Sequence, residues 1–175
     1  MKIIVDCEAS GPAPTFGDVI SFGAVVVEPA LNRTFRSPDM KPTCERFNEG
    51  AYKSIGLTRA EHENYTASVA DGFKSFHAWL KSLERAHEGD ALVLVSDNPA
   101  FDWQWINWGF YHAGFDRNPF GHSARRIGDM YAGLTGKENN TSRWKKLRDT
   151  RHTHDPLDDA IGNAEAYLKI WSGRR

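Results

Sequence analysis

Two apolar segments near the N-terminus constrain the fold most strongly. They read KIIVDCEA at 2–9 and DVISFGAVVVEP at 18–29, and the turn-rich loop SGPAPTFG separates them. Val, Ile and Phe are enriched in strands, so both segments are predicted to be strands. A shorter strand is expected at 33–37, and ALVLVS at 91–96 has the composition of a buried strand.

Helical patterns alternate with these strands farther along the chain. Apolar residues at 69, 73, 76, 79, 80 and 83 predict a helix over 69–86, with a turn at 89–90. Further helices are expected at 98–114 and 155–171, and a short strand with a helical turn at 125–134. Residues 38–66 are expected to be irregular, except for a capped helical turn that starts at Thr58. This order predicts a single α/β domain over 1–175, with a mixed sheet flanked by helices.

Composition excludes several classes of protein. Hydrophobic residues make up 40% and charged residues 26% of the 175 residues, which is typical of a globular domain. The apolar runs are too short to span a membrane. The net charge of −1 argues against a globally basic duplex binder, although RWKKLRDTRH at 143–152 is locally basic. Cys7 and Cys44 have no metal-ligand spacing, and Met1 leads directly into the first strand; a reduced, cytoplasmic protein without a signal peptide is therefore expected.

Two acids lie in the first strand. Asp6 and Glu8 are two residues apart and would share one face of the strand, while Cys7 would point to the opposite face and pack in the core. Burial of unpaired charges is costly, so these carboxylates need a partner. The alternative is that the strand ends at Val5 and leaves both acids in solvent.

Two further acids occupy equivalent positions at predicted helix starts. Asn98-Pro99 and Asp155-Pro156 each combine a capping residue with a proline at the first helical position. Asp102 and Asp159 then both fall at the fourth helical position. Acids favour the first turn of any helix, which is the structural alternative for Asp102. Asp158 resembles a capping-box acid, so capping explains Asp155 and Asp158 but explains Asp159 less well, because the capping roles are already filled.

Convergence of the three segments would crowd Asp6, Glu8, Asp102 and Asp159 together. Like charges about 4 Å apart repel by roughly 4 kcal/mol per pair at an effective dielectric of 20. Cations or raised pKa values would make this tolerable. Oxygen-only ligands suit Mg²⁺ or Mn²⁺, and two such ions can clamp the attacking and leaving oxygens of a phosphoryl displacement.

The motifs VDCEASG (5–11), DNPAFD (97–102) and HDPLDDA (154–160), in this order, resemble those of the DEDDh branch of the DEDD superfamily of 3′–5′ exonucleases. The phrases IGLT at 55–58 and DM at 129–130 also lie roughly where that family has similar ones. The resemblance covers residues 3 to about 168. It implies a ribonuclease-H-like fold with a five-stranded mixed sheet and a two-metal hydrolysis that releases nucleoside 5′-monophosphates from a 3′ end. It also implies that Asp6, Glu8, Asp102 and Asp159 bind two ions, Mg²⁺ or Mn²⁺, and that His154 is the general base.

The resemblance also implies where single-stranded DNA or RNA would bind. Many members have a threonine where this chain has Ala9, and Asp97 adds a negative charge beside the second motif. The residues expected to contact substrate are Ala9, Ser10, Gly11 and Phe16 in and after the first motif, Asn98 and Phe101 in the second, and the basic residues Arg143, Lys145, Lys146 and Arg148. Most aromatic residues of the helix after Asp102 are expected to lie in the core or to contact a partner.

Three interpretations follow from the sequence. The first is a metal-dependent 3′–5′ exonuclease acting on single-stranded DNA or RNA. The sequence leaves open whether the chain forms a homodimer, although relatives often dimerise. The others are a non-catalytic nucleic-acid-binding or protein-interaction module that retained the fold, and another ribonuclease-H-like metal-dependent nuclease. His152 is interpreted as a loop residue near the substrate and not as a zinc ligand. His154→Ala is therefore expected to abolish turnover, and His152→Ala to leave most of it.

Overall fold

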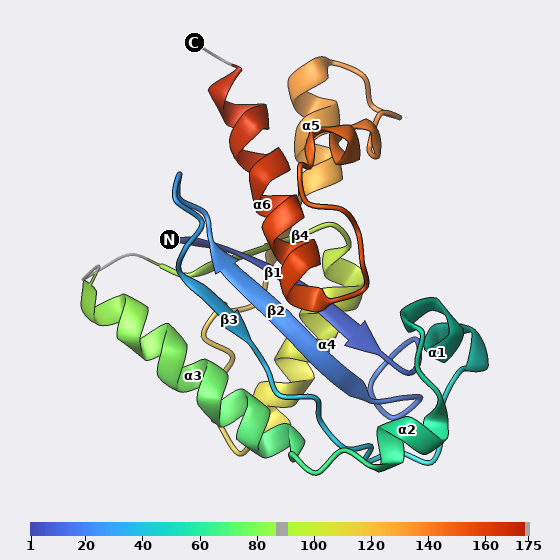
Figure 1. The fold of residues 1–175 in the computed structure, drawn as a ribbon. Coiled ribbons are helices and arrows are strands. Elements are labelled where there is room, and N and C mark those ends of the chain that lie inside the picture. Colours follow the sequence, from blue (N-terminus) through green and yellow to red (C-terminus); the bar gives the residue numbers. More distant parts are fainter. Residues whose placement is uncertain (87–90, 174–175) are drawn as a thin grey trace.

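Five strands form one mixed sheet in the computed structural model, which describes residues 1–86 and 91–173 (Figure 1). The strands are β1 (Lys2–Ala9), β2 (Val19–Val26), β3 (Thr34–Arg36), β4 (Val93–Ser96) and β5 (Ala124–Arg126). Their spatial order is β3-β2-β1-β4-β5. The pairs β1–β2 and β2–β3 are antiparallel, whereas β1–β4 and β4–β5 are parallel. The predicted α/β fold with a five-stranded mixed sheet is confirmed.

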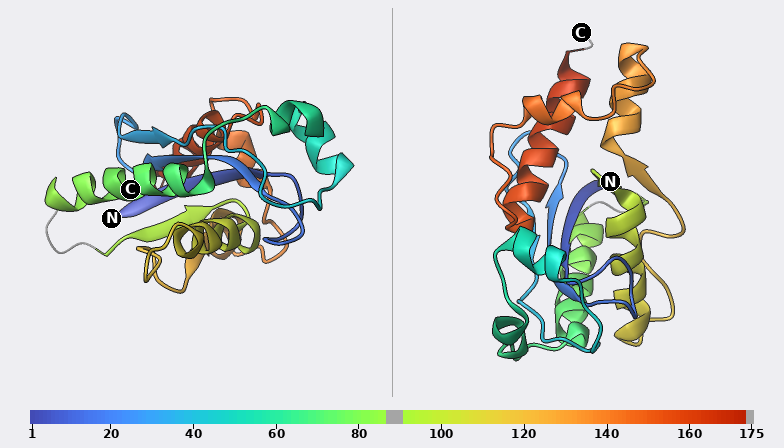
Figure 2. Two further views of the ribbon diagram at one scale, coloured as in Figure 1. Left: turned by 90° about the horizontal axis from the view of Figure 1, so that it is seen from below. Right: turned by 90° about the vertical axis from the view of Figure 1, so that its right-hand side faces the viewer.

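Helices cover both faces of this sheet. They are α1 (Glu49–Ile55), α2 (Arg59–Glu63), α3 (Val69–Ala86), α4 (Pro99–His112), α5 (Ile127–Thr135), the 3-10 helix η1 (Arg143–Leu147) and α6 (Pro156–Ser172). Helices α3 and α4 enclose one apolar core with the sheet, and α5, η1 and α6 enclose a second core on the opposite face. The two further views show the strands between these layers (Figure 2).

Most predicted elements are present, and the differences are local. The helix over 69–86 has the predicted bounds, and the capping box of Thr58 and Glu61 is present. The expectation that the rest of 38–66 is irregular was wrong, because α1 also forms there; the side chain of Asn48 caps it. The turn predicted at 89–90 lies outside the described residues.

Alternation along β1 places its side chains in two different environments. Ile3, Val5 and Cys7 lie in the core beneath α3 and α4, whereas Ile4 lies in the core beneath α6. Asp6 and Glu8 follow Ile4 at intervals of two and therefore face α6. Cys7 is buried, as predicted, and both cysteines are free. Within the described part of the chain, the helices are too short or too polar to cross a membrane.

Candidate active site

Three carboxylates converge where β1 meets the start of α6. Asp6, Glu8 and Asp159 each offer an oxygen atom, and these oxygens lie within 4.8 Å of one another. The strand continues through both acids to Ala9, so the alternative in which it ends at Val5 is excluded. Asp159 is fully buried, and Glu8 is partly exposed. The predicted convergence of the first and third motifs is therefore present.

Asp102 reaches the same strand from the opposite layer. Strand β4 pairs with β1 only from Lys2 to Ile4, so the later part of β1 has a free edge on that side. The backbone nitrogen of Cys7 donates to Oδ1 of Asp102 there, at 3.0 Å. Asp102 is 4% exposed and lies in the first turn of α4. This position links the start of α4 to the residue between Asp6 and Glu8.

Gly23 allows α6 to approach the sheet closely enough for this arrangement. It pairs with Asp6 across β1 and β2. A Cβ at Gly23 would lie 2.3 Å from the carbonyl oxygen of Pro156, so only glycine fits beneath the first residue of α6. The sequence analysis missed this role, although a glycine inside an apolar strand is a signal of close backbone approach.

Asp159 is held by donors from the segment that precedes α6. Nη2 of Arg148 donates to its backbone oxygen at 2.7 Å and to Oδ1 at 3.3 Å. The backbone nitrogen of Thr153 donates to Oδ1, and that of His154 donates to Oδ2. Arg148 was expected to contact the substrate backbone; its guanidinium is instead directed to Asp159 and is mostly buried.

His154 lies between Glu8 and solvent. Its Nδ1 is 3.6 Å from Oε1 of Glu8, and its side chain is 37% exposed. Its backbone has a φ of 61°, a left-handed conformation that non-glycine residues adopt rarely and that often occurs at functional sites. The ring is therefore directed to the carboxylates and remains accessible to a solute.

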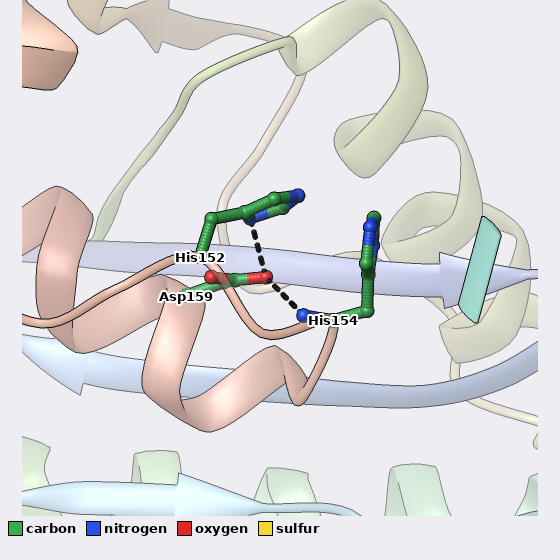
Figure 3. A group of neighbouring side chains, drawn as sticks. All are labelled: His152, His154 and Asp159. Atoms are coloured by element: carbon green, nitrogen blue, oxygen red, sulfur yellow. Dashed lines mark hydrogen bonds and ion pairs between the residues drawn. The ribbon is translucent and has the colours of Figure 1, made fainter. Parts of the chain in front are cut away.

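His152 lies closer to the carboxylates than the sequence suggested. It is a loop residue, as predicted, but its Nδ1 is 2.7 Å from Oδ2 of Asp159. The rings of His152 and His154 lie together beside the Asp159 carboxylate, with centroids 4.3 Å apart (Figure 3). The two-residue spacing of His152 and His154 could have suggested that their rings lie together, but it carries no signal for the contact of His152 with Asp159.

Burial, together with neighbouring charges, raises the pKa values of Asp6, Glu8 and Asp102. Burial, followed by the charges of Asp102, Glu8 and Asp159, raises the pKa of Asp6 well above its ordinary range, and Arg148 opposes this. Burial and the charges of Asp159 and Asp102 raise the pKa of Glu8 to about 8. Burial raises the pKa of Asp102 to about 7. The site therefore concentrates negative charge that Arg148 does not fully offset.

The two predicted helix starts differ in their caps. Asp155 accepts hydrogen bonds from the backbone nitrogens of Leu157 and Asp158, as predicted for a cap. Asp158 was wrongly expected to complete a capping box, because the Asp155 nitrogen donates to the hydroxyl of Thr153 instead. The exposed side chain of Asn98 makes no capping hydrogen bond. The backbone oxygen of Asn98 accepts from the backbone nitrogen of Asp102.

The residues in and beside the first two motifs that were expected to contact substrate fall into two groups. Ala9, Ser10 and Gly11 are buried, and the Ser10 hydroxyl accepts from the nitrogen of Asp18. Phe16 is 54% exposed, with the Arg46 guanidinium 4.7 Å from its ring centroid. Phe101 is partly buried and packs edge-on against Trp105. The structure thus leaves Phe16 and Asn98 more accessible than the other members of this set.

The basic run forms η1 and the loop after it. Trp144 is buried and anchors η1 in the second core. Arg143, Lys145 and Lys146 are exposed. Nζ of Lys145 lies 2.5 Å from Oδ2 of Asp97, which gives a partner to the additional acid of the second motif.

Two hollows flank the carboxylates. One of about 320 Å³ lies on the Asp6 side and includes Lys145, Arg148 and His152 in its lining. A smaller one of about 160 Å³ lies on the Glu8 side and includes His154, Arg36 and Tyr65. The acidic cluster is therefore open to solute from two directions.

Comparisons with known proteins agree with this geometry. No protein-family model matches the chain. The chain is 32% identical over 174 residues to the 3′–5′ DNA exonuclease Cap18 of Escherichia coli, covering 96% of this chain and 90% of that protein.

Solved structures show the same fold. The nuclease domain of 3′hExo, a DEDDh family member bound to rAMP, has a TM-score of 0.77 and 16% identity, with 99% of this chain and 92% of that chain covered. Cell-death related nuclease 4 has a TM-score of 0.75 and 14% identity, with 99% and 64% covered. Exonuclease I of E. coli in complex with a dA16 oligonucleotide has a TM-score of 0.70 and 18% identity, with 99% and 41% covered. These structures confirm the ribonuclease-H-like fold. Together with the similarity to Cap18 over most of both chains, they show that this chain belongs to the DEDDh branch of the DEDD superfamily of 3′–5′ exonucleases.

Proposed function

We propose that this exonuclease degrades single-stranded DNA from its 3′ end to nucleoside 5′-monophosphates, with two divalent ions bound by Asp6, Glu8, Asp102 and Asp159 and with His154 as the general base. The observation that carries the proposal is the gathering of carboxylates from β1 and α6 beside an accessible imidazole. We propose DNA rather than RNA as the substrate because Cap18, which this chain matches over 90% of that protein's length, is a DNA exonuclease.

The donor set fits hard divalent ions. Family membership implies a dependence on divalent metal ions, and the cluster of Asp6, Glu8 and Asp159 offers only oxygen atoms. Mg²⁺ and Mn²⁺ prefer such ligands. Burial first, and then the charges of the neighbouring carboxylates, raise the pKa values of Asp6 and Glu8, and bound cations would favour the ionised form of both groups. When bound, the ions would offset charge on the phosphate and lower the pKa of the attacking water.

His154 has the position of a general base. An imidazole has an ordinary pKa near neutrality and can accept a proton from water while the phosphorus is attacked. The bond between phosphorus and the 3′ oxygen of the shortened strand then breaks, and that oxygen takes a proton from solvent. The backbone of His154 is left-handed, and its backbone nitrogen donates to Oδ2 of Asp159. These two features fix the backbone position from which the imidazole side chain extends.

Substrate is proposed to cross the carboxylates from one hollow to the other. The hollow next to Lys145 offers positive charge for a phosphate, and the one next to His154 has Tyr65 in its lining. Phe16 is exposed on the neighbouring loop and has the flat apolar surface on which a base can stack. Such side chains would contact the phosphates of the DNA and stack on any base, so little sequence preference is expected.

The experiment is degradation of 5′-labelled single-stranded DNA and RNA oligomers of equal sequence with Mg²⁺ or Mn²⁺. A ladder shortened one nucleotide at a time, faster on DNA, is expected, with activity lost in Asp6→Asn. Faster degradation of RNA would reverse the proposed preference. Nucleic-acid binding without cleavage would favour the non-catalytic module, and internal cleavage would favour another kind of nuclease. The homodimer also stays a proposal, and light scattering of the full chain tests it.

A further inference from the structure

Two imidazoles and one carboxylate form a second potential ligand set at the edge of the active site. His152, His154 and Asp159 each offer a ligand atom, and these atoms lie within 4.8 Å of one another. This set differs in chemistry from the all-oxygen cluster of Asp6, Glu8 and Asp159, because two of its three donors are nitrogen. The proposed reaction uses His154 and Asp159 but gives His152 no part.

The geometry combines one fixed ligand with two adjustable ones. Asp159 is fully buried, and its Oδ1 accepts from Thr153 and Arg148. Its Oδ2 lies toward the His152 ring, 2.7 Å from Nδ1 (Figure 3). The side chains of His152 and His154 are 54% and 37% exposed, so small rotations can bring both nitrogens to a shared ion without disturbing the core.

We propose that His152, His154 and Asp159 form a Zn²⁺ site whose occupation inhibits the exonuclease, which revises the interpretation of His152 drawn from the sequence. Zn²⁺ is bound by imidazole nitrogen and carboxylate oxygen in tetrahedral geometry, and water can complete the set where the rings face solvent. Sites with nitrogen ligands favour Zn²⁺ over Mn²⁺, whereas Mg²⁺ prefers oxygen. Inhibition rests on the proposed function, because Zn²⁺ would occupy the nitrogen lone pair with which His154 accepts a proton.

A purely structural part for His152 is the alternative. Its Nδ1 can hold Asp159 in place by a hydrogen bond alone. His152→Asn separates the two ideas, because an asparagine amide can still donate toward Asp159 but is a poor Zn²⁺ ligand. His122→Asn is the matched control, since His122 is an exposed histidine that makes no part of this cluster.

Calorimetric titration of the full chain with Zn²⁺, in saturating Mg²⁺, tests binding directly. Wild type is expected to bind, His152→Asn to bind at least about tenfold more weakly, and His122→Asn to match wild type. Equal affinity in wild type and His152→Asn, or no binding in wild type, would overturn the proposal. This measurement does not depend on turnover.

Inhibition is measured on 5′-labelled DNA with Mg²⁺ and increasing Zn²⁺, each variant relative to its own rate without zinc. The midpoint for inhibition is expected to rise at least about tenfold in His152→Asn, and a chelator should restore the wild-type rate. An unchanged midpoint overturns the inhibitory site while leaving the exonuclease proposal intact. A third outcome is zinc binding that depends on His152 in a protein that does not degrade the DNA at all. That result would overturn both the inhibition and the proposed exonuclease function, and it would support only the zinc site.

Discussion

The carbonyl oxygen of Pro156 lies directly over Gly23, 2.3 Å from the place that a Cβ on Gly23 would occupy. Gly23→Ala must therefore push the start of α6 away from β2, and with it Asp159. Overpacking of this kind typically costs about 1–3 kcal/mol. We expect a lower free energy of unfolding in urea and weaker activation by Mn²⁺. Gly133→Ala is the control, because a Cβ there meets nothing within 4 Å; equal behaviour of the two variants would contradict the account.

Arg148 is expected to stabilise the metal-free protein through Asp159. Removing one partner of a buried ion pair costs about 3–5 kcal/mol, and these two side chains are 10% and 0% exposed. Arg148→Met should therefore unfold at lower urea concentration, with partial recovery in Mn²⁺, which can compensate the same carboxylate. Lys169→Met breaks the exposed pair with Asp149 and should cost less than about 1 kcal/mol. Similar losses in both variants would contradict this reading of Arg148.

His154→Asn isolates the general base from the backbone around it. Asparagine tolerates a left-handed φ such as the 61° of His154, so the fold should be retained. The loss of a general base is expected to lower kcat about 10²–10⁴-fold with little change in the melting temperature. His152→Ala should leave most of the turnover, since the His152 ring contacts the Asp159 carboxylate and has no part in the proposed proton transfer. Single-turnover rates measure both, and a His154→Asn enzyme that retained wild-type kcat would remove His154 from this role.

The sequence predicted the sheet and its acidic motifs because both are local signals. Apolar composition predicts strands, alternation places Asp6 and Glu8 on one face, and a proline marks the start of α4 and of α6. The contacts of Arg148 and His152 with Asp159 depend instead on how residues 148–155 fold back over α6. A basic residue in a loop has the same appearance in a sequence whether it faces solvent or a buried carboxylate. The Asp155-Pro156 cap could be predicted, but the missing cap of Asn98 could not, because side-chain rotamers depend on neighbours distant in sequence.

The exposed lysines of η1 should differ in their contribution to DNA binding. Each phosphate contact contributes about 0.7 to the salt slope for a single strand. Lys146→Ala is expected to reduce the slope by about this amount, and Lys145→Ala by less, because Asp97 already pairs with its ammonium group. Fluorescence anisotropy of labelled DNA, in an Asp6→Asn background that prevents hydrolysis, measures the slopes. Slopes unchanged by Lys146→Ala would place the substrate away from η1.

Metal-free protein should lose stability as the pH rises toward 8. The pKa of Glu8 is about 8 in the fold against an ordinary value of 4.5, and that of Asp102 is about 7 against 3.8. Between these limits the unfolded chain binds fewer protons than the folded chain, so the free energy of unfolding falls with increasing pH. Glu8→Gln should flatten this dependence, and Mn²⁺ should reverse part of it because it stabilises the ionised carboxylates. Urea unfolding from pH 5 to 8.5 in EDTA, repeated in Mn²⁺, measures both effects. Stability that stayed constant or rose over this range in EDTA would mean that the carboxylates are compensated by the protein itself and do not require a cation.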